Sequence, residues 1–519
     1  MMGERRMQAT LSIRSNARRR GGEIALMCDD RSFTWVELRD LIARFAAVLR
    51  DEGVKPGDRV AILADNCDLY LSAFFAIPWA GAILLPLNTR LSPGELVELL
   101  ETGDPTLILF DAGRADLLQR TFDAGAKRVP TLAMRGEARS IDALQAKAAP
   151  MEDLNRHGND PASIFFTGGT TGRSKGAVMT HANHMFNSLG MWTELGADTS
   201  EVRYLHAPPM FHVADALFVH AVTAIGGRHV LLPRFDAVAV IDSIERHAIT
   251  DVYLVPTMVG TFLDELERNP RTLPTLRRLY YGAMPMPEEV VRRFMKMLPQ
   301  CGPIQLYGQS EAGPILTMLL PRDHDVSGKT TRLRSAGLPM PGGEVAIHDA
   351  DGNEVEQGVV GEIVARSGTV MPGYWNDPEQ TAKALRNDWL YTGDGGYVDA
   401  DGFVYVVDRI KDMIISGGEN IYSIEVERAI SKHPAVSQCA VIGVPDPRWG
   451  ERVHAAIVLR SGEAVTTEEM QTHCRQHIAG YKIPRSIDWR TSLPLSGPGK
   501  ILKRKLRDEV MEAQSPLPA

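Results

Sequence analysis

From about residue 160 onward the chain alternates short apolar runs with amphipathic stretches, and no other feature constrains the fold as strongly. The apolar runs have the length of buried strands and are bounded by turn residues; they cover residues 162–166, 229–233, 251–256, 277–282 and 303–308. Helical patterns separate them, as in residues 287–298. Because strands that alternate with helices pair in parallel and are covered on both faces, we predict an α/β fold with stacked, largely parallel sheets.

One apolar stretch, residues 69–87, contains no charged residue and raises the question of a membrane span. Pro78, Gly81 and Pro86 interrupt it, and a proline inside a helix removes a backbone hydrogen bond. We therefore predict a helix followed by a buried strand at residues 83–87, in a soluble protein without a transmembrane segment.

Charge and cysteine content exclude several classes of protein. Lys and Arg number 57 against 65 Asp and Glu, a net charge of −8, so the basic excess typical of a nucleic-acid-binding protein is absent. The five cysteines are scattered and form no CxxC or Cys/His cluster, which favours a reducing, cytoplasmic compartment over a disulfide framework or a zinc site. The arginines of residues 5–20 precede no apolar segment; we interpret them as the solvated face of a first helix, with attraction to a membrane surface as the alternative.

A glycine- and threonine-rich loop, TGGTTGRSKG at residues 167–176, directly follows the apolar run 162–166. Glycines let backbone N–H groups turn inward as an anion nest, threonines add hydroxyl donors and Lys175 adds a positive charge. The loop is not a Walker A motif, because Gly172 is followed by Arg173 instead of Lys. It predicts a phosphate-binding site at the carboxyl end of a strand, where ligands of open α/β sheets bind.

Three further motifs follow along the chain. YGQSE at residues 307–311 places a carboxylate, Glu311, after a predicted strand, and Mg²⁺ bound to nucleotide oxygens typically takes one or two protein carboxylates. WLYTGD at residues 389–394 precedes DRIKDMIISGGENI at residues 408–421. SGPGK at residues 496–500 lies near the end of the sequence.

Together the four motifs resemble those of the AMP-forming adenylate enzymes, which include acyl- and aryl-CoA synthetases, adenylation domains of peptide synthetases, and firefly luciferase. TGGTTGRSKG is similar to that family's TSGTTGxPKG, with a glycine for its serine and Ser174 for its proline, and YGQSE is similar to its YGxTE. The resemblance covers nearly the whole chain, with the motifs in the family's order. It implies an acyl-CoA synthetase: a carboxylic acid and ATP give acyl-AMP and pyrophosphate, and CoA then gives acyl-CoA and AMP, with Mg²⁺ as cofactor.

The resemblance also implies roles for single residues in the first half-reaction. Glu311 would hold Mg²⁺, Lys500 would bridge the acyl carboxylate and the α-phosphate, and His212 would lie beside the acyl carboxylate. The nucleotide site would include the phosphate-loop residues Thr167, Gly168, Gly169, Thr170, Thr171, Gly172 and Lys175, the adenine-site residues Gly282, Ala283, Met284 and Tyr307, the adjoining Gly308, Gln309 and Ser310, and the ribose-binding residues Asp394 and Arg409.

For the second half-reaction, the resemblance implies a small C-terminal lobe that rotates about a hinge at Lys411. Gly417 and Gly418 would line the pantetheine tunnel, because glycine permits close backbone approach. Trp449 and Tyr481 would lie near CoA, and for Trp449 a half-buried packing role is the alternative.

The length of 519 residues suggests about three domain-sized units, but the motifs favour a different partition. We predict a large domain over residues 1–410 that contains the ATP and acyl sites and a β-rich part with Asp-Gly hairpin turns at 351–352 and 401–402. A small, mobile α+β domain over residues 411–519 would carry Lys500.

The acyl pocket is predicted from the same motifs, with His212, Met258, Tyr281, Gly282 and Gly308 as its contacts. The stretches around them are rich in Met, Val, Ala and Gly and contain no Lys or Arg, so an apolar tail is expected. We favour a medium- or long-chain fatty acid, with a cinnamate-like aryl acid as the alternative, because Ala214 stands where coumarate ligases often carry a tyrosine.

Other polar residues near these motifs receive structural interpretations. His181 and His184 have HxxH spacing without an acidic or cysteine partner, which favours helix packing over a metal site. Asp215 is expected to cap a helix or lie at the pocket rim.

The expected partners are small molecules, with a homodimer as the alternative to a monomer. A free-standing ligase that uses CoA is favoured, and the alternatives are an enzyme that loads a separate carrier protein and a nucleotide-binding protein that has lost catalysis. The latter would be expected to lack Lys500 or Glu311, and both are present.

Overall fold

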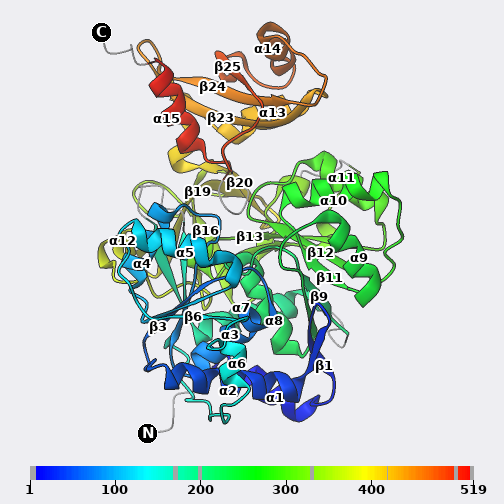
Figure 1. Cartoon of the computed structure of the whole chain (residues 1–519). Helices are drawn as coiled ribbons and strands as arrows, with labels where there is room; N and C mark the ends of the chain where they lie inside the picture. Colours follow the sequence, from blue (N-terminus) through cyan, green and yellow to red (C-terminus); the bar gives the residue numbers. More distant parts are fainter. Residues whose placement is uncertain are drawn as a thin grey trace. The chain divides into compact units, whose positions relative to one another are not determined.

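The computed structural model describes residues 7–167, 174–196, 201–327, 332–417, 419–495 and 501–514. The chain divides into two compact units, which are described separately below (Figure 1). The first comprises Met1–Val345 and Ala365–Leu390, and the second comprises Ala346–Val364 and Tyr391–Ala519.

The first unit contains a six-stranded sheet with the order β6-β5-β3-β4-β7-β8. Its strands are β3 (Arg59–Leu63), β4 (Ile83–Pro86), β5 (Leu107–Phe110), β6 (Thr131–Ala133), β7 (Pro161–Thr167) and β8 (Lys175–Thr180). Neighbours pair in parallel except β7 and β8, which form an antiparallel hairpin. The helices of this part of the chain are α2 (Trp35–Asp51), α3 (Asp68–Trp79), α4 (Pro93–Gly103), α5 (Ala115–Asp123) and α6 (Ile141–Gln145).

Successive residues of β3 belong to two different cores, as expected for a sheet covered on both faces. Val60 and Ile62 pack in a cluster with residues of α2 and α3, whereas Ala61 and Leu63 pack with residues of α4. The continuous apolar runs of the sequence are therefore strands with two buried faces.

The same unit contains a nine-stranded sheet with the order β15-β14-β13-β12-β11-β9-β10-β1-β2. Its strands are β1 (Ile24–Cys28), β2 (Arg31–Thr34), β9 (Arg203–His206), β10 (Arg228–Leu231), β11 (Asp251–Tyr253), β12 (Arg278–Gly282), β13 (Gly302–Tyr307), β14 (Thr317–Leu319) and β15 (Leu338–Pro339). The six central strands are parallel, and β2, β14 and β15 add antiparallel edges. The accompanying helices are α1 (Leu11–Arg19), α7 (His181–Leu195), α8 (Val213–Ile225), α9 (Ala237–His247), α10 (Pro256–Arg268) and α11 (Glu288–Met297). The predicted largely parallel α/β architecture is confirmed.

The uncharged stretch 69–87 forms helix α3 and strand β4, as the sequence predicts. Among the residues that the structure describes, no helix has both the length and the apolar character needed to cross a membrane.

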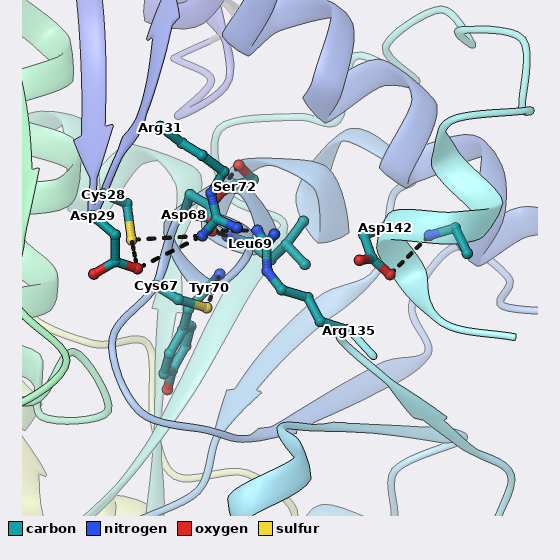
Figure 2. A network of polar contacts seen from close by, with 11 residues as sticks. Cys28, Asp29, Arg31, Cys67, Asp68, Leu69, Tyr70, Ser72, Arg135 and Asp142 are labelled. Carbon is teal, nitrogen blue, oxygen red and sulfur yellow. Dashed lines mark hydrogen bonds and ion pairs between the residues drawn. The ribbon is translucent and has the colours of Figure 1, made fainter. Parts of the chain in front are cut away.

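The N-terminus of α3 is fixed by a buried carboxylate (Figure 2). Asp68 is 1% exposed and accepts hydrogen bonds from Nη2 of Arg31 at 3.1 Å and Nη2 of Arg135 at 2.5 Å. The Sγ atom of Cys67 accepts the backbone N–H of Tyr70 and caps the helix. Two guanidinium groups compensate the cost of burying one carboxylate, and they join β2 and the segment after β6 to the start of the apolar helix.

A five-stranded antiparallel-rich sheet follows, and the division between the two units passes through its strands. The strands are β16 (Gly343–His348), β17 (Gly361–Ser367), β18 (Leu385–Arg386), β19 (Trp389–Val398) and β20 (Val404–Arg409), and α12 (Pro378–Ala384) precedes β18. The Asp-Gly sequence at 401–402 turns the chain between β19 and β20, where Gly402 has a φ of 86°. The prediction of a hairpin at this position is confirmed.

The second unit also contains a five-stranded sheet with the order β22-β21-β24-β23, to which β25 adds on β24. Its elements are β21 (Ile414–Ser416), β22 (Glu419–Ile421), α13 (Ser423–Ser431), β23 (Val436–Asp446), β24 (Gly450–Leu459), α14 (Thr467–Arg475), β25 (Ser486–Arg490) and α15 (Lys503–Gln514). This is the α+β composition predicted for the C-terminal part of the chain.

Candidate active site

The predicted phosphate loop joins the two strands of the β7–β8 hairpin. Thr167 pairs with Lys175 in the ladder, so both residues lie at the loop end of the hairpin, and both are half-buried. The residues between them that we predicted to bind phosphates, Gly168, Gly169, Thr170, Thr171 and Gly172, lie outside the described residues.

Glu311 lies in a short 3-10 helix, η2 (Ser310–Ala312), directly after β13. Its carbonyl oxygen accepts the N–H of Met371 at 2.9 Å, and its Oε1 atom accepts the hydroxyl of Tyr374 at 2.7 Å. The turn into η2 requires glycine at Gly308, since a Cβ atom there would lie 2.1 Å from the carbonyl oxygen of Pro314. Gln309 and Ser310 are half-buried beside it.

Tyr374 connects Glu311 to the phosphate-loop hairpin. Its backbone forms an antiparallel bridge with Ala177 of β8, and the ammonium of Lys175 lies 5.1 Å from the centre of its ring. The structure thus brings Lys175 and Glu311, two predicted site residues, to opposite parts of one side chain. Tyr374 lies in none of the four sequence motifs; the signal for it was the pair of aromatic residues after Pro372 and Gly373, in a loop between two regular elements.

The surroundings of Glu311 fit the predicted Mg²⁺. The residue is 8% exposed, and among the described residues its carboxylate has no ion-pair partner and one hydrogen-bond donor, the neutral Tyr374 hydroxyl. A buried carboxylate without a cation is costly, and oxygen donors of this kind are those that Mg²⁺ prefers. Glu311 is therefore the residue that would hold the ion, which would neutralise phosphate charge when bound.

The predicted adenine residues lie at the ends of adjacent parallel strands, because Gly282 pairs with Leu306 and Tyr307 ends β13. A Cβ atom on Gly282 would lie 2.3 Å from the carbonyl oxygen of Leu306, so no other residue fits. Ala283 has a φ of 67°, an unfavourable conformation for a residue other than glycine. Backbone strain of this kind concentrates at ligand sites. Met284 is half-buried next to it.

The predicted ribose residues face each other in the second unit. Asp394 and Arg409 are paired across the β19–β20 ladder, and Nε of Arg409 lies 2.7 Å from Oδ1 of Asp394. The ion pair fixes the orientation of both side chains. Lys411, the predicted hinge residue, lies two residues further in the 3-10 helix η5 (Ile410–Asp412).

Two of the predicted CoA-site residues are in contact within the second unit. Gly417 donates its N–H to the carbonyl oxygen of Trp449 at 2.8 Å, and a Cβ atom on Gly417 would lie 2.9 Å from the indole. The guanidinium groups of Arg448 and Arg485 lie 4.8 and 4.5 Å from the indole ring centre. Tyr481 is 44% exposed. Gly418 and Lys500 lie outside the described residues.

The predicted acyl residues have different degrees of burial. His212 immediately precedes α8 and is half-buried, as is Met258 in α10. Tyr281 is buried, with its hydroxyl 2.9 Å from Nε2 of His324. Because its side chain is buried in the core, the backbone of Tyr281 is the part that would contact an acyl group.

The expectation for Asp215 was wrong. The residue is fully buried, and the structure assigns no side-chain cap to the N-terminus of α8. Its carboxylate accepts hydrogen bonds from the Tyr204 hydroxyl at 2.9 Å and from Nδ1 of His206 at 2.8 Å, and His206 contacts His229 through its other nitrogen at 2.9 Å. A carboxylate at the start of a helix suggests capping, but burial requires these internal partners instead.

The HxxH pair packs inside the first unit, as predicted. Nδ1 of His181 accepts the N–H of Ala9, and Nε2 of His184 lies 2.9 Å from the Ser163 hydroxyl. His184 also stacks on His220, with 4.0 Å between ring centres. Within the described part of the chain, no group of three or more His, Cys, Asp or Glu residues could hold a metal ion.

Comparison with known proteins identifies the family. The sequence profile of the AMP-binding enzymes matches residues 13–375, more than half of the chain, and that of the AMP-binding enzyme C-terminal domain matches residues 425–500. The chain belongs to the AMP-binding enzyme family. The predicted resemblance to adenylate-forming enzymes is therefore confirmed.

Members of the AMP-binding enzyme family with related sequences include ligases with different acids and acceptors. Feruloyl-CoA synthase from Amycolatopsis sp is 37% identical over 501 residues, covering 96% of this chain and 97% of the relative. Fatty acid–[acyl-carrier-protein] ligase ScoC from Streptomyces coeruleorubidus is 32% identical over 488 residues, covering 93% of both chains.

A solved structure of the AMP-binding enzyme family has the same fold. It is o-succinylbenzoate CoA synthetase from Bacillus subtilis in complex with ATP and magnesium ion, with a TM-score of 0.85, 31% identity, and coverage of 96% of this chain and 99% of the other. The predicted use of ATP and Mg²⁺ agrees with this relative.

Proposed function

We propose that the protein is an AMP-forming ligase that activates a carboxylic acid with ATP and transfers the acyl group to CoA. The observation that carries the proposal is the arrangement in the first unit, where Tyr374 contacts Glu311 by its hydroxyl and Lys175 by its ring. It combines a phosphate-binding lysine and a buried carboxylate suited to Mg²⁺ at the carboxyl ends of strands.

The first half-reaction needs electrostatic help more than proton transfer. The acid has a pKa of about 4–5 and is already ionised at neutral pH, so no general base is required. The obstacle is the repulsion between the carboxylate and the α-phosphate that it attacks. Lys175, backbone N–H groups of the phosphate loop and Lys500 would offset this repulsion, and Glu311 would hold Mg²⁺, which would neutralise phosphate charge when bound.

The second half-reaction requires a thiol placed next to the acyl-AMP carbonyl carbon. A thiol with a pKa of about 8.5 is a few per cent thiolate at neutral pH and strongly nucleophilic. Placing it next to the carbonyl carbon therefore supplies most of the catalysis. We assign this placement to Gly417 and Trp449, which are in contact, and to Tyr481. Lys411 would act as the hinge between the two half-reactions.

For the acid, two candidates have support. Feruloyl-CoA synthase and o-succinylbenzoate CoA synthetase both act, by name, on acids that carry an aromatic ring, which favours an aryl acid of the ferulic type. The ScoC relative is named for a fatty acid and a carrier protein, which supports a medium- or long-chain fatty acid and an acyl-carrier protein as the second combination.

The test is product analysis with a panel of acids. The enzyme is incubated with ATP, Mg²⁺ and CoA, and with ferulate, cinnamate, benzoate or straight-chain fatty acids, and nucleotides and thioesters are separated by chromatography. We expect AMP and acyl-CoA in equal amounts, with ferulate among the best substrates. Replacing CoA by a phosphopantetheinylated carrier protein tests the second acceptor. Release of ADP in place of AMP would overturn the proposal.

A further inference from the structure

We propose that Tyr374 is a positioning residue that sets the geometry of both charged groups of the phosphate site, the Glu311 carboxylate through its hydroxyl and the Lys175 ammonium through its ring. The inference rests on the proposed function, because it takes Glu311 as the Mg²⁺ residue and Lys175 as a phosphate-binding residue. In this role Tyr374 itself does not contact the substrate.

The backbone of Tyr374 is held on both sides. On one side it adds to β8: the N–H of Val178 donates to the Gly373 carbonyl oxygen at 3.1 Å, and the N–H of Trp375 donates to the Gly176 carbonyl oxygen at 2.7 Å. On the other side, the N–H of Tyr374 donates to Oγ1 of Thr381 in α12 at 2.9 Å. The side chain therefore projects from a fixed point of the first unit.

The hydroxyl of Tyr374 orients Glu311 without neutralising it. A hydrogen bond to a carboxylate is short and strong, and at 2.7 Å this one fixes Oε1 of Glu311. An Arg or Lys in the same place would cancel the carboxylate charge and repel a divalent cation. A neutral donor keeps the full negative charge for Mg²⁺, in the way that partners of metal ligands generally orient them.

The ring of Tyr374 provides a second, separate interaction. The ammonium of Lys175 lies 5.1 Å from the ring centre, within the range of a cation–π attraction. Lysine has four rotatable bonds, so an aromatic face at the end of the hairpin restricts where its charge lies. One residue thus fixes the separation between a cation and an anion that bind the same nucleotide.

The two interactions can be separated by substitution. Tyr374→Phe removes the hydroxyl and keeps the ring, whereas Tyr374→Leu removes both. The matched control is Tyr397→Phe, since Tyr397 lies in β19 of the second unit and stacks on Tyr405 with 4.8 Å between ring centres.

The first measurement is Mn²⁺ binding in the presence of ATP without acid, followed by electron paramagnetic resonance. We expect Tyr374→Phe to weaken Mn²⁺ binding by about 10–100-fold, the usual effect of removing a partner of a metal ligand, and Tyr397→Phe to bind as the unmodified enzyme does. In a Glu311→Gln background, Tyr374→Phe should have no further effect, because its route to the ion is gone. Unchanged Mn²⁺ binding by Tyr374→Phe would overturn the inference.

The second measurement is ATP binding without metal, by calorimetry in the presence of a chelator. Tyr374→Phe should bind ATP as the unmodified enzyme does, and Tyr374→Leu should bind it about two- to fivefold more weakly through loss of the cation–π contact. Equal ATP affinity for both variants would overturn the part of the inference that concerns Lys175.

A further variant keeps the test valid if Tyr374→Phe does not fold. Thr381→Val retains the whole tyrosine but removes the acceptor of its N–H, so it should weaken Mn²⁺ binding less than Tyr374→Phe; no weakening would then count against the inference. Failure of the proposed function would appear differently, as absence of AMP formation by the unmodified enzyme with every acid, while the binding measurements need only ATP.

Discussion

The ammonium of Lys503 lies 2.8 Å from Oε1 of Glu427 inside the second unit. Lys503 follows Lys500 by three residues in the sequence. Lys503 also donates to the hydroxyl of Ser423, and the Ser423 N–H donates to Oδ2 of Asp408. Burial alone would lower the pKa of Lys503, but the carboxylates of Glu427 and Asp408 raise it above its ordinary value. The start of α15 is therefore anchored to the segment that precedes Lys411.

The Lys503–Glu427 pair should be important for stability. Lys503→Met leaves a buried carboxylate without its cation, which typically costs about 3–5 kcal/mol, and the double variant with Glu427→Leu should recover much of that loss. Hydrogen exchange of the peptides that cover β25, measured at increasing urea concentration, reports on this unit. Additive destabilisation by the two substitutions would contradict the coupling.

Lys500→Ala should separate the two half-reactions. We expect adenylate formation to fall by about 10²–10³-fold, because a positive charge on the crowded transition state is lost, while CoA still attacks preformed acyl-AMP. Pyrophosphate exchange measures the first step, and thioester formation from synthetic acyl-AMP measures the second. Equal losses in both assays would refute the assignment of Lys500.

Gly417→Ala should affect CoA more than ATP. Gly417 has a φ of 63°, and a Cβ atom would lie 2.9 Å from the Trp449 indole. Backbone strain of about 1–2 kcal/mol and a displaced indole should raise the KM for CoA about tenfold and leave pyrophosphate exchange unchanged. Gly450→Ala is the matched control, because Gly450 has a φ of 78° but no side-chain neighbour within 4 Å of an added Cβ. Similar effects of both substitutions would point to backbone strain alone.

Buried histidines should make the first unit sensitive to acid. Burial lowers the pKa of His220 from 6.5 to about 3. Because the folded-state pKa is the lower one, the unfolded chain takes up the proton first as the pH falls, and stability decreases from pH 6.5 downward. Between about pH 7 and about pH 5 this histidine should account for about 2 kcal/mol of lost stability.

His220→Leu should remove that part of the pH dependence. In the described structure Nδ1 of His220 is buried without a hydrogen-bond partner, so the substitution should cost little near neutral pH. Urea titrations of the variant and of the unmodified protein at both pH values measure how much the free energy of unfolding of each changes with pH. A variant with the same acid sensitivity as the unmodified protein would show that His220 does not titrate in this window.

The sequence predicted those parts of the site that depend on local pattern. The apolar run before TGGTTGRSKG becomes β7, and the run that ends in Tyr307 becomes β13, so the motifs at their carboxyl ends lie where a parallel sheet places ligands. Gly282 and Gly308 were implied by the family resemblance and not by a local pattern, and a Cβ atom at either position would clash with a carbonyl oxygen of another segment, that of Leu306 or of Pro314.

What the sequence could not predict depends on pairing between distant segments. Tyr374 reaches Glu311, 63 residues earlier in the chain, only because its segment adds to the edge of β8. The partners of Asp215 likewise come from another element, because Tyr204 and His206 both lie in β9. Neither set of contacts leaves a periodic signal in the sequence, because tertiary packing determines both.

The salt bridges of Asp68 have a consequence for how the chain folds during synthesis. One guanidinium, that of Arg31, is already outside the ribosome when Asp68 emerges, but that of Arg135 follows 67 residues later. Until then the carboxylate has only one of its two cations, so burial of the start of α3 is incompletely compensated. At translation rates of about 5–20 residues per second, several seconds pass between the synthesis of Asp68 and that of Arg135. During this period, chaperones that recognise exposed apolar segments can bind the apolar helix.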